Sequence, residues 1–308
     1  MLKVSNLTKS FGSVQAVDHI SFDVSIGEIF GFLGPNGAGK TTTINMICGL
    51  LTPDAGEIEL DGQALRPDKS SLRKKLGVVP QEIALYEELN AYENLRFWGR
   101  LYDMSGSTLT SRMHDLLELS GLSERAKDRV KTYSGGMKRR LNMIAGLLHS
   151  PALLLLDEPT VGIDPQGRHN ILDSVKEIAA QGTTILYTTH YMEEAEALCD
   201  RLAIMDHGRI LALGTENEIK NIVGENSIIR LTGAMNQKDI ESLTQRFAHL
   251  TIESKKERDA MLSFPSTHGA GDIIEAIFES GIQVENLQIK EPSLDSVFIK
   301  LTGRELRD

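Results

Sequence analysis

The chain has 308 residues, of which 41% are hydrophobic and 25% are charged, and its formal net charge is -10. This length is about twice that of a usual single domain, and the composition is that of a folded globular protein. A disulfide-stapled miniprotein and a disordered or fibrous chain are thereby excluded. The acidic balance provides no basic field for nucleic acid, so we expect no nucleic-acid partner.

Membrane insertion and secretion are also disfavoured. The purest apolar run, residues 152–156, is far shorter than the roughly 20 apolar residues that a membrane-spanning helix needs. The first residues lack the apolar stretch of a secretory signal. The two cysteines, Cys48 and Cys199, lie far apart and follow no metal-binding spacing. We therefore expect a cytosolic chain that reaches a membrane only through a partner.

Alternating apolar and polar residues open the chain. They run from Leu2 to Val24 and predict strands, and residues 56–60 predict another strand that enters a tight turn at Asp61-Gly62. Between these segments, the apolar run 29–33 predicts a buried strand that leads into a glycine-rich turn and a helix. The alternating segments predict a small antiparallel β layer beside a main sheet.

Two further apolar runs, residues 153–156 and 184–188, are likewise followed by polar residues. With helical patterns between them, these runs predict a largely parallel sheet that is covered on both faces. Residues 90–148 are mainly helical in pattern and predict an inserted helical subdomain. A hairpin over residues 201–213 is expected to close this first unit.

The rest of the chain predicts a second, smaller domain. After Ser227 the expected order is strand, helix, strand, strand, helix, strand and helix, which is typical of a split βαβ domain. The last helix carries apolar residues at helical spacing, namely Leu294, Val297, Phe298 and Leu301. We predict an α/β domain over residues 1–215, with its helical subdomain at about 90–148, and a small α+β accessory domain over residues 216–308.

The glycine-rich turn fits the pattern of a phosphate-binding loop, G-x4-G-K-[ST]. The residues concerned are Gly34, Pro35, Asn36, Gly37, Ala38, Gly39, Lys40 and Thr41, with Thr42 next in the helix. Glycines let backbone N–H groups close around phosphate oxygens at a helix N-terminus. Lys40 is expected to reach the β- and γ-phosphates, and the Thr41 hydroxyl to bind Mg²⁺. A surface glycine-rich turn is the alternative, but the flanking strand and helix disfavour it.

Two carboxylates, Asp157 and Glu158, end the apolar run 153–156. Ligands bind at this carboxyl edge of a parallel sheet. Asp157 suits indirect Mg²⁺ binding through water, whereas Glu158 would polarise the attacking water as a general base. The alternative is an ordinary charged strand end, which the phosphate-loop pattern makes less favourable.

With these motifs and those that follow, the chain resembles the ATP-binding subunit of an ABC transporter. Gln81, after an expected strand at 76–79, matches the glutamine that contacts Mg²⁺ and water in that family. Ser134, Gly135 and Gly136 match the anion-binding centre of the signature motif, although its flanking positions hold Tyr133 and Met137 instead of Leu and Gln.

Three further positions carry the same resemblance. Asp164 matches the D-loop aspartate, His190 the switch histidine, and Phe11 the aromatic residue that stacks on adenine. Taken singly, these matches have plainer interpretations, with Phe11 as a core residue, Gln81 as a loop residue and His190 as a strand-end residue. Their order along the chain favours the family, which implies a P-loop NTPase fold with ATP and Mg²⁺ as cofactors. It also implies catalytic roles for Glu158, His190 and Gln81.

The resemblance also implies partners. A second copy of the chain is expected to complete the ATP site, and a separate transmembrane permease to hold the chain at the cytoplasmic face of the cell membrane. Residues 188–201 and 292–306 resemble the daunorubicin-resistance and multidrug-exporter subgroup, which implies export of a drug-like or other small molecule. The apolar side of the last helix could cover its own sheet, the permease or the second copy, and we favour the second copy.

Two other functions compete with transport. A soluble ABC ATPase acting on nucleic acid or the ribosome is the main alternative, and the single cassette and the net charge of -10 disfavour it. A P-loop kinase or GTPase would leave Ser134, Gly135, Gly136 and His190 without a role.

Overall fold

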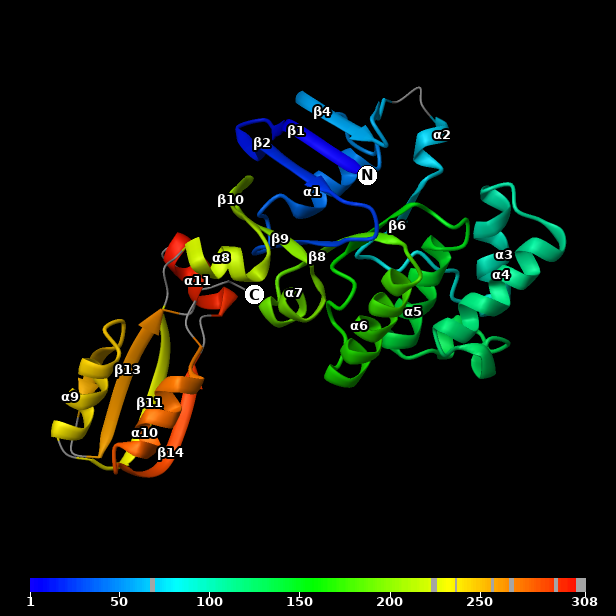
Figure 1. The fold of residues 1–308 in the computed structure, drawn as a ribbon. Coiled ribbons are helices and arrows are strands. Elements are labelled where there is room, and N and C mark those ends of the chain that lie inside the picture. The colour runs from blue at the N-terminus through cyan, green and yellow to red at the C-terminus, as the bar shows by residue number, and fades with distance from the viewer. Residues whose placement is uncertain are drawn as a thin grey trace. The chain divides into compact units, whose positions relative to one another are not determined.

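A computed structural model describes residues 1–66, 70–222, 226–235, 237–255, 258–265, 269–290 and 293–302 (Figure 1). The contacts within the chain divide it into two compact units that meet between Thr215 and Glu216. Among the described residues, no helix has the length and apolar character that a membrane crossing requires.

A six-stranded sheet forms the centre of the first unit. In the order β10, β9, β3, β8, β7, β6, its strands are Arg209–Gly214, Arg201–Asp206, Ile29–Leu33, Thr184–Thr189, Leu153–Asp157 and Leu76–Val79. The pairs from β9 to β6 are parallel, and only the edge strand β10 runs antiparallel to its neighbour. Every residue of β3, β7 and β8 is buried, as the apolar runs predict.

A second, four-stranded antiparallel sheet lies in the same unit. In the order β2, β1, β4, β5, its strands are Val14–Val24, Leu2–Phe11, Ala55–Leu60 and Gln63–Ala64. Phe22 of β2 packs against Phe30 and Phe32 of β3, with ring centroids 5.5 and 4.8 Å away. These aromatic contacts join the two sheets through one apolar cluster. The antiparallel pairing of the four strands confirms the expected layer.

Helices surround the central sheet. They are α1 (Lys40–Ile47), α2 (Ser70–Arg73), α3 (Ala91–Leu101), α4 (Gly106–Leu119), α5 (Gly135–Gly146), α6 (Pro165–Ala180) and α7 (Met192–Leu198). Asn90 and Glu93 form a capping box that starts α3, since each side chain accepts a hydrogen bond from the other's backbone N–H. Two short 3₁₀ turns, Ser123–Arg125 and Val130–Thr132, lead from α4 to α5.

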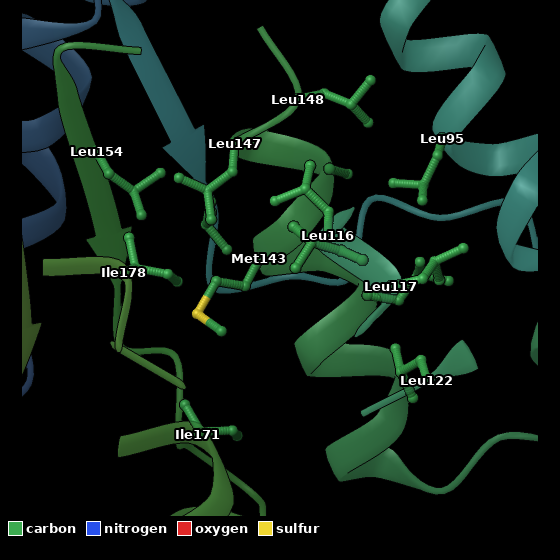
Figure 2. Packing of buried hydrophobic residues seen from close by; sticks show 14 of the residues in the cluster. Leu95, Leu116, Leu117, Leu122, Met143, Leu147, Leu148, Leu154, Ile171 and Ile178 are labelled. Carbon is green, nitrogen blue, oxygen red and sulfur yellow. The ribbon is translucent and has the colours of Figure 1, made fainter. Parts of the chain in front are cut away.

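The helices α3, α4 and α5 share a core with the sheet. Figure 2 shows the packing residues Leu95, Leu116, Leu117, Met143, Leu154, Ile171 and Ile178, which come from α3, α4, α5, β7 and α6. Helix α4 ends at Leu119, and Gly121 follows it with a φ of +63°. Leu122 is buried in the same cluster from outside the helix.

The second unit has its own antiparallel sheet. In the order β12, β13, β11, β14, the strands are Thr251–Lys255, Asp259–Pro265, Asn226–Ala234 and Gln283–Lys290. Its helices are α8 (Glu216–Ile222), α9 (Gln237–Arg246), α10 (Gly271–Glu279) and α11 (Leu294–Thr302). Ile229 and Leu262 of the sheet share an apolar core with Ile240 of α9 and Ile277 of α10. The sequence pattern misses α8 but gives the order of the other elements correctly.

The expectation for the last helix is wrong. Leu294, Val297 and Phe298 of α11 are fully buried within this chain, and α11 packs against α8. The apolar side of α11 is therefore used inside the monomer, and these three residues are not a surface for a second copy.

Candidate functional site

The glycine-rich loop joins the buried strand β3 to helix α1. Gly37 and Gly39 have φ values of +82° and +108°, a region that side chains disfavour. A Cβ at Gly39 would lie only 2.4 Å from the Ala16 carbonyl oxygen. Glycine is therefore required at this point for the loop to turn closely before the first helical N–H groups.

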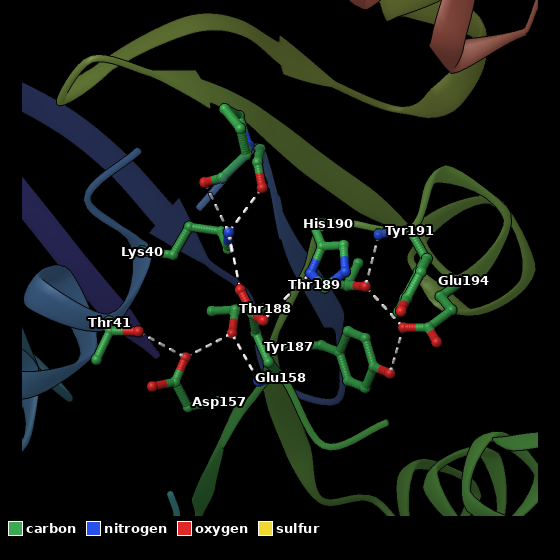
Figure 3. Close-up of polar contacts among 12 residues, drawn as sticks. Lys40, Thr41, Asp157, Glu158, Tyr187, Thr188, Thr189, His190, Tyr191 and Glu194 are labelled. Atoms are coloured by element: carbon green, nitrogen blue, oxygen red, sulfur yellow. Dashed lines mark hydrogen bonds and ion pairs between the residues drawn. The ribbon is translucent and has the colours of Figure 1, made fainter. Parts of the chain in front are cut away.

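Lys40 begins α1 and turns its buried side chain back over the loop. Its Nζ donates hydrogen bonds to the carbonyl oxygens of Gly34 at 2.6 Å and Pro35 at 3.1 Å. The same Nζ lies 2.9 Å from Glu158 Oε1 (Figure 3). A buried ammonium is thus held between two loop carbonyls and a carboxylate, where it can also meet an anionic ligand.

Glu158 follows the last residue of β7 in a left-handed backbone conformation, with a φ of +44°. Such backbone strain in a non-glycine residue gathers at functional sites. Its N–H donates to Thr188 Oγ1 at 2.9 Å, and its Oε2 lies 3.2 Å from Nδ1 of His190, the residue after β8. The carboxylate is therefore fixed between Lys40 and His190, where it can accept a proton from a water molecule.

Asp157 is the last residue of β7 and is also buried. Its Oδ1 accepts hydrogen bonds from the Thr188 hydroxyl at 2.8 Å and the Thr41 hydroxyl at 3.2 Å. Burial raises the pKa of the Asp157 carboxyl, and the two hydroxyl donors oppose this rise. A cation beside the carboxylate would favour its charged form in the same way.

These oxygen atoms fit Mg²⁺, which takes few protein ligands and keeps several of its waters. Among the described residues, there is no group of three or more His, Cys, Asp and Glu side chains that could hold a metal ion. The Thr41 hydroxyl and the Asp157 carboxylate together provide the sparse set of hard donors that Mg²⁺ prefers.

A pocket of about 320 Å³ lies over this group of residues. Its walls include Phe11, Ala16, the loop and helix residues 36–42, Gln81 and Glu158. Phe11 ends β1 and is half exposed, with Lys9 Nζ 5.7 Å from its ring centroid, and its ring lines the pocket where a flat ligand could stack on it. The fold thus gathers the predicted residues from β1, the glycine loop, the segment after β6 and the end of β7.

Eight predicted residues do not line this pocket. Four of them are next to lining residues in the chain or in space, namely Gly34, Pro35, Asp157 and His190. The other four stand at the starts of α5 and α6. Ser134 caps α5, where its Oγ accepts a hydrogen bond from Met137 N at 3.3 Å, and Gly135 and Gly136 form the first turn of that helix. Asp164 caps α6, where its Oδ1 accepts from Gly167 N at 2.8 Å. Ser134, Gly135 and Asp164 are exposed. One chain therefore does not bring these residues to its own pocket.

Sequence reasoning missed two residues that support the site. Thr188 bonds to both carboxylate-bearing residues, and Arg139 of α5 donates to the carbonyl oxygens of Gln81 at 2.6 Å and Pro80 at 3.2 Å. Burial lowers the pKa of the Arg139 guanidinium. A pattern could have identified both: Thr188 is polar within a wholly buried strand, and Arg139 shares a helical face with the apolar Met143.

The ABC transporter family matches residues 17–161 of this chain. The family described as "ATP-binding protein DrrA1-3-like, C-terminal domain" matches residues 214–302. The two matches lie in different structural units, since the second begins at the boundary between them.

Curated relatives match over nearly the whole chain. The linearmycin resistance ATP-binding protein LnrL of Bacillus subtilis is 44% identical, with 100% of both chains covered. The daunorubicin resistance ATP-binding protein DrrA3 of Streptomyces coeruleorubidus is 37% identical over 99% of this chain and 97% of its own. A Nod factor export ATP-binding protein I of Rhizobium sp. is 39% identical over 99% and 98%.

Solved structures share the fold. A structure titled as the ATP-binding subunit of an ABC transporter has a TM-score of 0.65 and 33% identity, covering 73% of this chain and 93% of its own. A dimeric ATP-binding cassette in a post-hydrolysis state, bound to ADP and Pi, has a TM-score of 0.62 and 28% identity, covering 70% and 98%. The chain therefore belongs to the ABC transporter family, as a nucleotide-binding, ATP-hydrolysing subunit of the drug-resistance group that carries a DrrA-like C-terminal domain.

Proposed function

We propose that this chain hydrolyses ATP to drive a separate membrane permease that exports a drug-like or other small molecule. The observation that carries the proposal is the position of the Glu158 carboxylate, held 2.9 Å from Lys40 Nζ and 3.2 Å from His190 Nδ1 at the wall of the pocket. A base, a phosphate-binding cation and a histidine then converge where the γ-phosphate would lie.

The predicted residues in and beside the pocket have proposed roles in this reaction. Phe11 stacks on the adenine, and the loop from Gly34 to Gly39 binds phosphate oxygens through its N–H groups, with Thr42 beside it. Lys40 binds the β- and γ-phosphates. Glu158 takes the proton of the attacking water, and His190 holds the Glu158 carboxylate in place on the side of the γ-phosphate. Residues 1–215 are the proposed nucleotide-binding domain, and residues 216–308 the accessory domain.

Mg²⁺ is the proposed metal, held by the Thr41 hydroxyl and Gln81 and, through water, by Asp157. When bound, it would neutralise charge on the phosphates. Thr188 supports this arrangement because its hydroxyl donates to the Asp157 carboxylate and accepts from the Glu158 N–H. It therefore fixes the Asp157 side chain and the Glu158 backbone relative to each other.

A second copy of the chain is the proposed source of the missing half of the site. Ser134, Gly135, Gly136 and Asp164 stand at the N-termini of α5 and α6, where backbone N–H groups favour anions, yet they are outside the pocket of their own chain. The dimeric cassettes among the similar structures support this assignment. In a dimer, each signature loop would meet the nucleotide bound by the other copy.

The permease partner and the cargo class rest on the relatives. Their names describe ATP-binding proteins of linearmycin resistance, daunorubicin resistance and Nod factor export. We propose export of a molecule of this general kind, with the chain held at the cytoplasmic face of the membrane by its permease. Membrane contact would come only through that permease, and nucleic acid is not a proposed partner.

Reconstitution tests the proposal. The chain is purified together with a candidate permease, placed in vesicles, and assayed for ATP hydrolysis with and without linearmycin-like and anthracycline molecules. We expect hydrolysis that cargo stimulates, and ATP-dependent movement of cargo that the Glu158→Gln variant abolishes. Hydrolysis that persists in Glu158→Gln would contradict the assignment of the base, and stimulation by RNA or ribosomes alone would favour the soluble alternative.

A further inference from the structure

A second polar network lies behind His190 and uses a charge that the proposed mechanism does not need. Glu194 of α7 is 1% exposed, although a buried carboxylate is costly unless it is well paired. Its Oε2 accepts hydrogen bonds from the Thr189 hydroxyl at 2.7 Å and the Tyr187 hydroxyl at 2.9 Å (Figure 3). Glu194 does not line the pocket.

The second oxygen of this carboxylate has a weaker partner. Glu194 Oε1 lies 3.5 Å from Nε of Arg168 in α6, and within the part of the chain that the structure describes neither of these two atoms makes a hydrogen bond. An ion pair that is buried on one side and so loosely satisfied contributes little net stability. The ion pair is better explained by what it positions.

The network fixes the backbone on both sides of His190. Thr189 Oγ1 donates to Glu194 and also accepts from Tyr191 N at 3.0 Å, so residues 189 and 191 are tied to one carboxylate. The His190 ring packs against the Tyr191 ring with centroids 4.1 Å apart. The Arg168 guanidinium covers the same Tyr191 ring, 4.0 Å from its centroid.

Arg168 also connects this network to the start of α6. Its backbone N–H donates to the carbonyl oxygen of Asp164, the residue that caps the helix. The first turn of α6 is thus joined through Arg168 to Tyr191, and through Tyr191 to the ring that lies 3.2 Å from Glu158 Oε2.

We propose that Glu194 and Arg168 are positioning residues that hold the His190 ring against Glu158 and tie its position to the first turn of α6. The inference rests on the proposed function, in which His190 and Glu158 serve ATP hydrolysis. Neither Glu194 nor Arg168 lines the pocket. Burial and the nearby Glu194 raise the pKa of the Tyr187 phenol, so it remains a hydrogen-bond donor to the carboxylate at all ordinary pH values.

The decisive variant is Glu194→Gln in the full-length chain, because Gln keeps the size of the side chain and an oxygen acceptor but removes the charge that faces Arg168. We expect kcat for ATP hydrolysis to fall about 10- to 100-fold through misplacement of His190. ATP affinity should change less than about twofold, because Lys40 and the glycine loop are untouched. The matched control is Glu193→Gln, an exposed carboxylate in the same turn of α7, which should leave kcat unchanged.

A double-mutant cycle separates positioning from general structural damage. If Glu194 acts through His190, Glu194→Gln should cause no further loss of kcat in a His190→Ala background. The NMR signals of the His190 ring should also shift in Glu194→Gln and in Arg168→Met but not in Glu193→Gln. This second readout requires no turnover, so it tests the network even if ATP hydrolysis is not the chain's activity.

Three results would overturn the inference. They are a Glu194→Gln protein with the kcat of the wild type, a loss that is undiminished in the His190→Ala background, and His190 signals that do not move. If Glu194→Gln does not fold, Tyr187→Phe replaces it, because this change removes one hydrogen-bond donor to the carboxylate and keeps the buried ring. We then expect a smaller fall in kcat at constant ATP affinity. An unchanged kcat in Tyr187→Phe would overturn the proposal. If turnover is lost in Glu158→Gln but kept in the Glu194 and Tyr187 variants, the positioning role is refuted while the proposed ATP hydrolysis stands.

Discussion

The two units differ in what they bury. Besides its apolar core, the first unit buries charged side chains, including those of Lys40, Asp157, Glu158 and Glu194. Over the described residues of the second unit, the buried polar side chains are the hydroxyls of Ser227 and Ser263. Buried charge is costly unless it is paired, and Lys40, Asp157 and Glu158 find their partners in and beside the pocket. The difference indicates that chemistry belongs to the first unit and that packing dominates the second.

The largest expected effect is on turnover, from Glu158→Gln. Glutamine keeps the shape and can still contact Lys40 and His190, but it cannot accept the proton of an attacking water. We expect steady-state ATP hydrolysis to fall about 10²- to 10⁴-fold while a fluorescent nucleotide analogue still binds. The control is Glu177→Gln, an exposed carboxylate of α6. Near-normal turnover in Glu158→Gln would remove the base from the mechanism and weaken the contrast between the units.

A second effect should appear in nucleotide affinity, from Lys40→Ala. The change removes the cation that two loop carbonyls and Glu158 hold at the pocket wall. A charge-assisted hydrogen bond is worth about 1.5–3 kcal/mol, so we expect nucleotide binding to weaken roughly 10- to 100-fold in equilibrium titration. Lys40→Met keeps the aliphatic stem and separates the loss of charge from the loss of packing. Wild-type affinity in both variants would contradict the proposed role.

A third effect concerns assembly, from Gly135→Asp. A Cβ at Gly135 would meet only Ile163 Cδ1, at an ordinary distance of 3.4 Å, so the monomer should fold normally. The new carboxylate would face the nucleotide of the second copy and repel its phosphates. We expect ATP-dependent dimerisation of the Glu158→Gln protein, measured by light scattering, to be lost in the double variant and kept with Gly135→Asn. A monomer in saturating ATP with full hydrolysis would refute the need for two copies.

The sequence predicts those parts of the molecule that depend on local pattern. The strands β3, β7 and β8, the glycine loop and the pair Asp157 and Glu158 are each recognisable within a few residues. The contact between Lys40 and Glu158 cannot be recognised in the sequence, because it depends on the order in which β3, β8 and β7 pair. The roles of Arg139 and Thr188 depend on the same pairing: their polar character is visible in the sequence, but their partners Gln81 and Asp157 are distant in it.

The second unit shows the same limit in its packing. The apolar spacing of α11 correctly predicts a helix with one buried side, but a periodic pattern contains no information about what covers that side. The covering element is α8, a seven-residue helix whose pattern is too short to be recognised. The apolar side of α11, for which a second copy of the chain was expected, is therefore covered within the monomer.

The smallest effect on chemistry should come from Phe298→Asp in the second unit. Phe298 is fully buried, so an unpaired carboxylate there should destabilise this unit by at least the roughly 3–5 kcal/mol that a buried Phe→Ala change costs. Every pocket residue lies before the boundary at Thr215, so nucleotide affinity should stay within about twofold of the wild type. Circular dichroism melting and nucleotide titration measure the two effects, with Ile299→Asp as a partly exposed neighbouring control. A Phe298→Asp protein that melts normally but no longer dimerises would restore a role for α11 between subunits, whereas loss of nucleotide affinity would mean that the second unit shapes the pocket of the first.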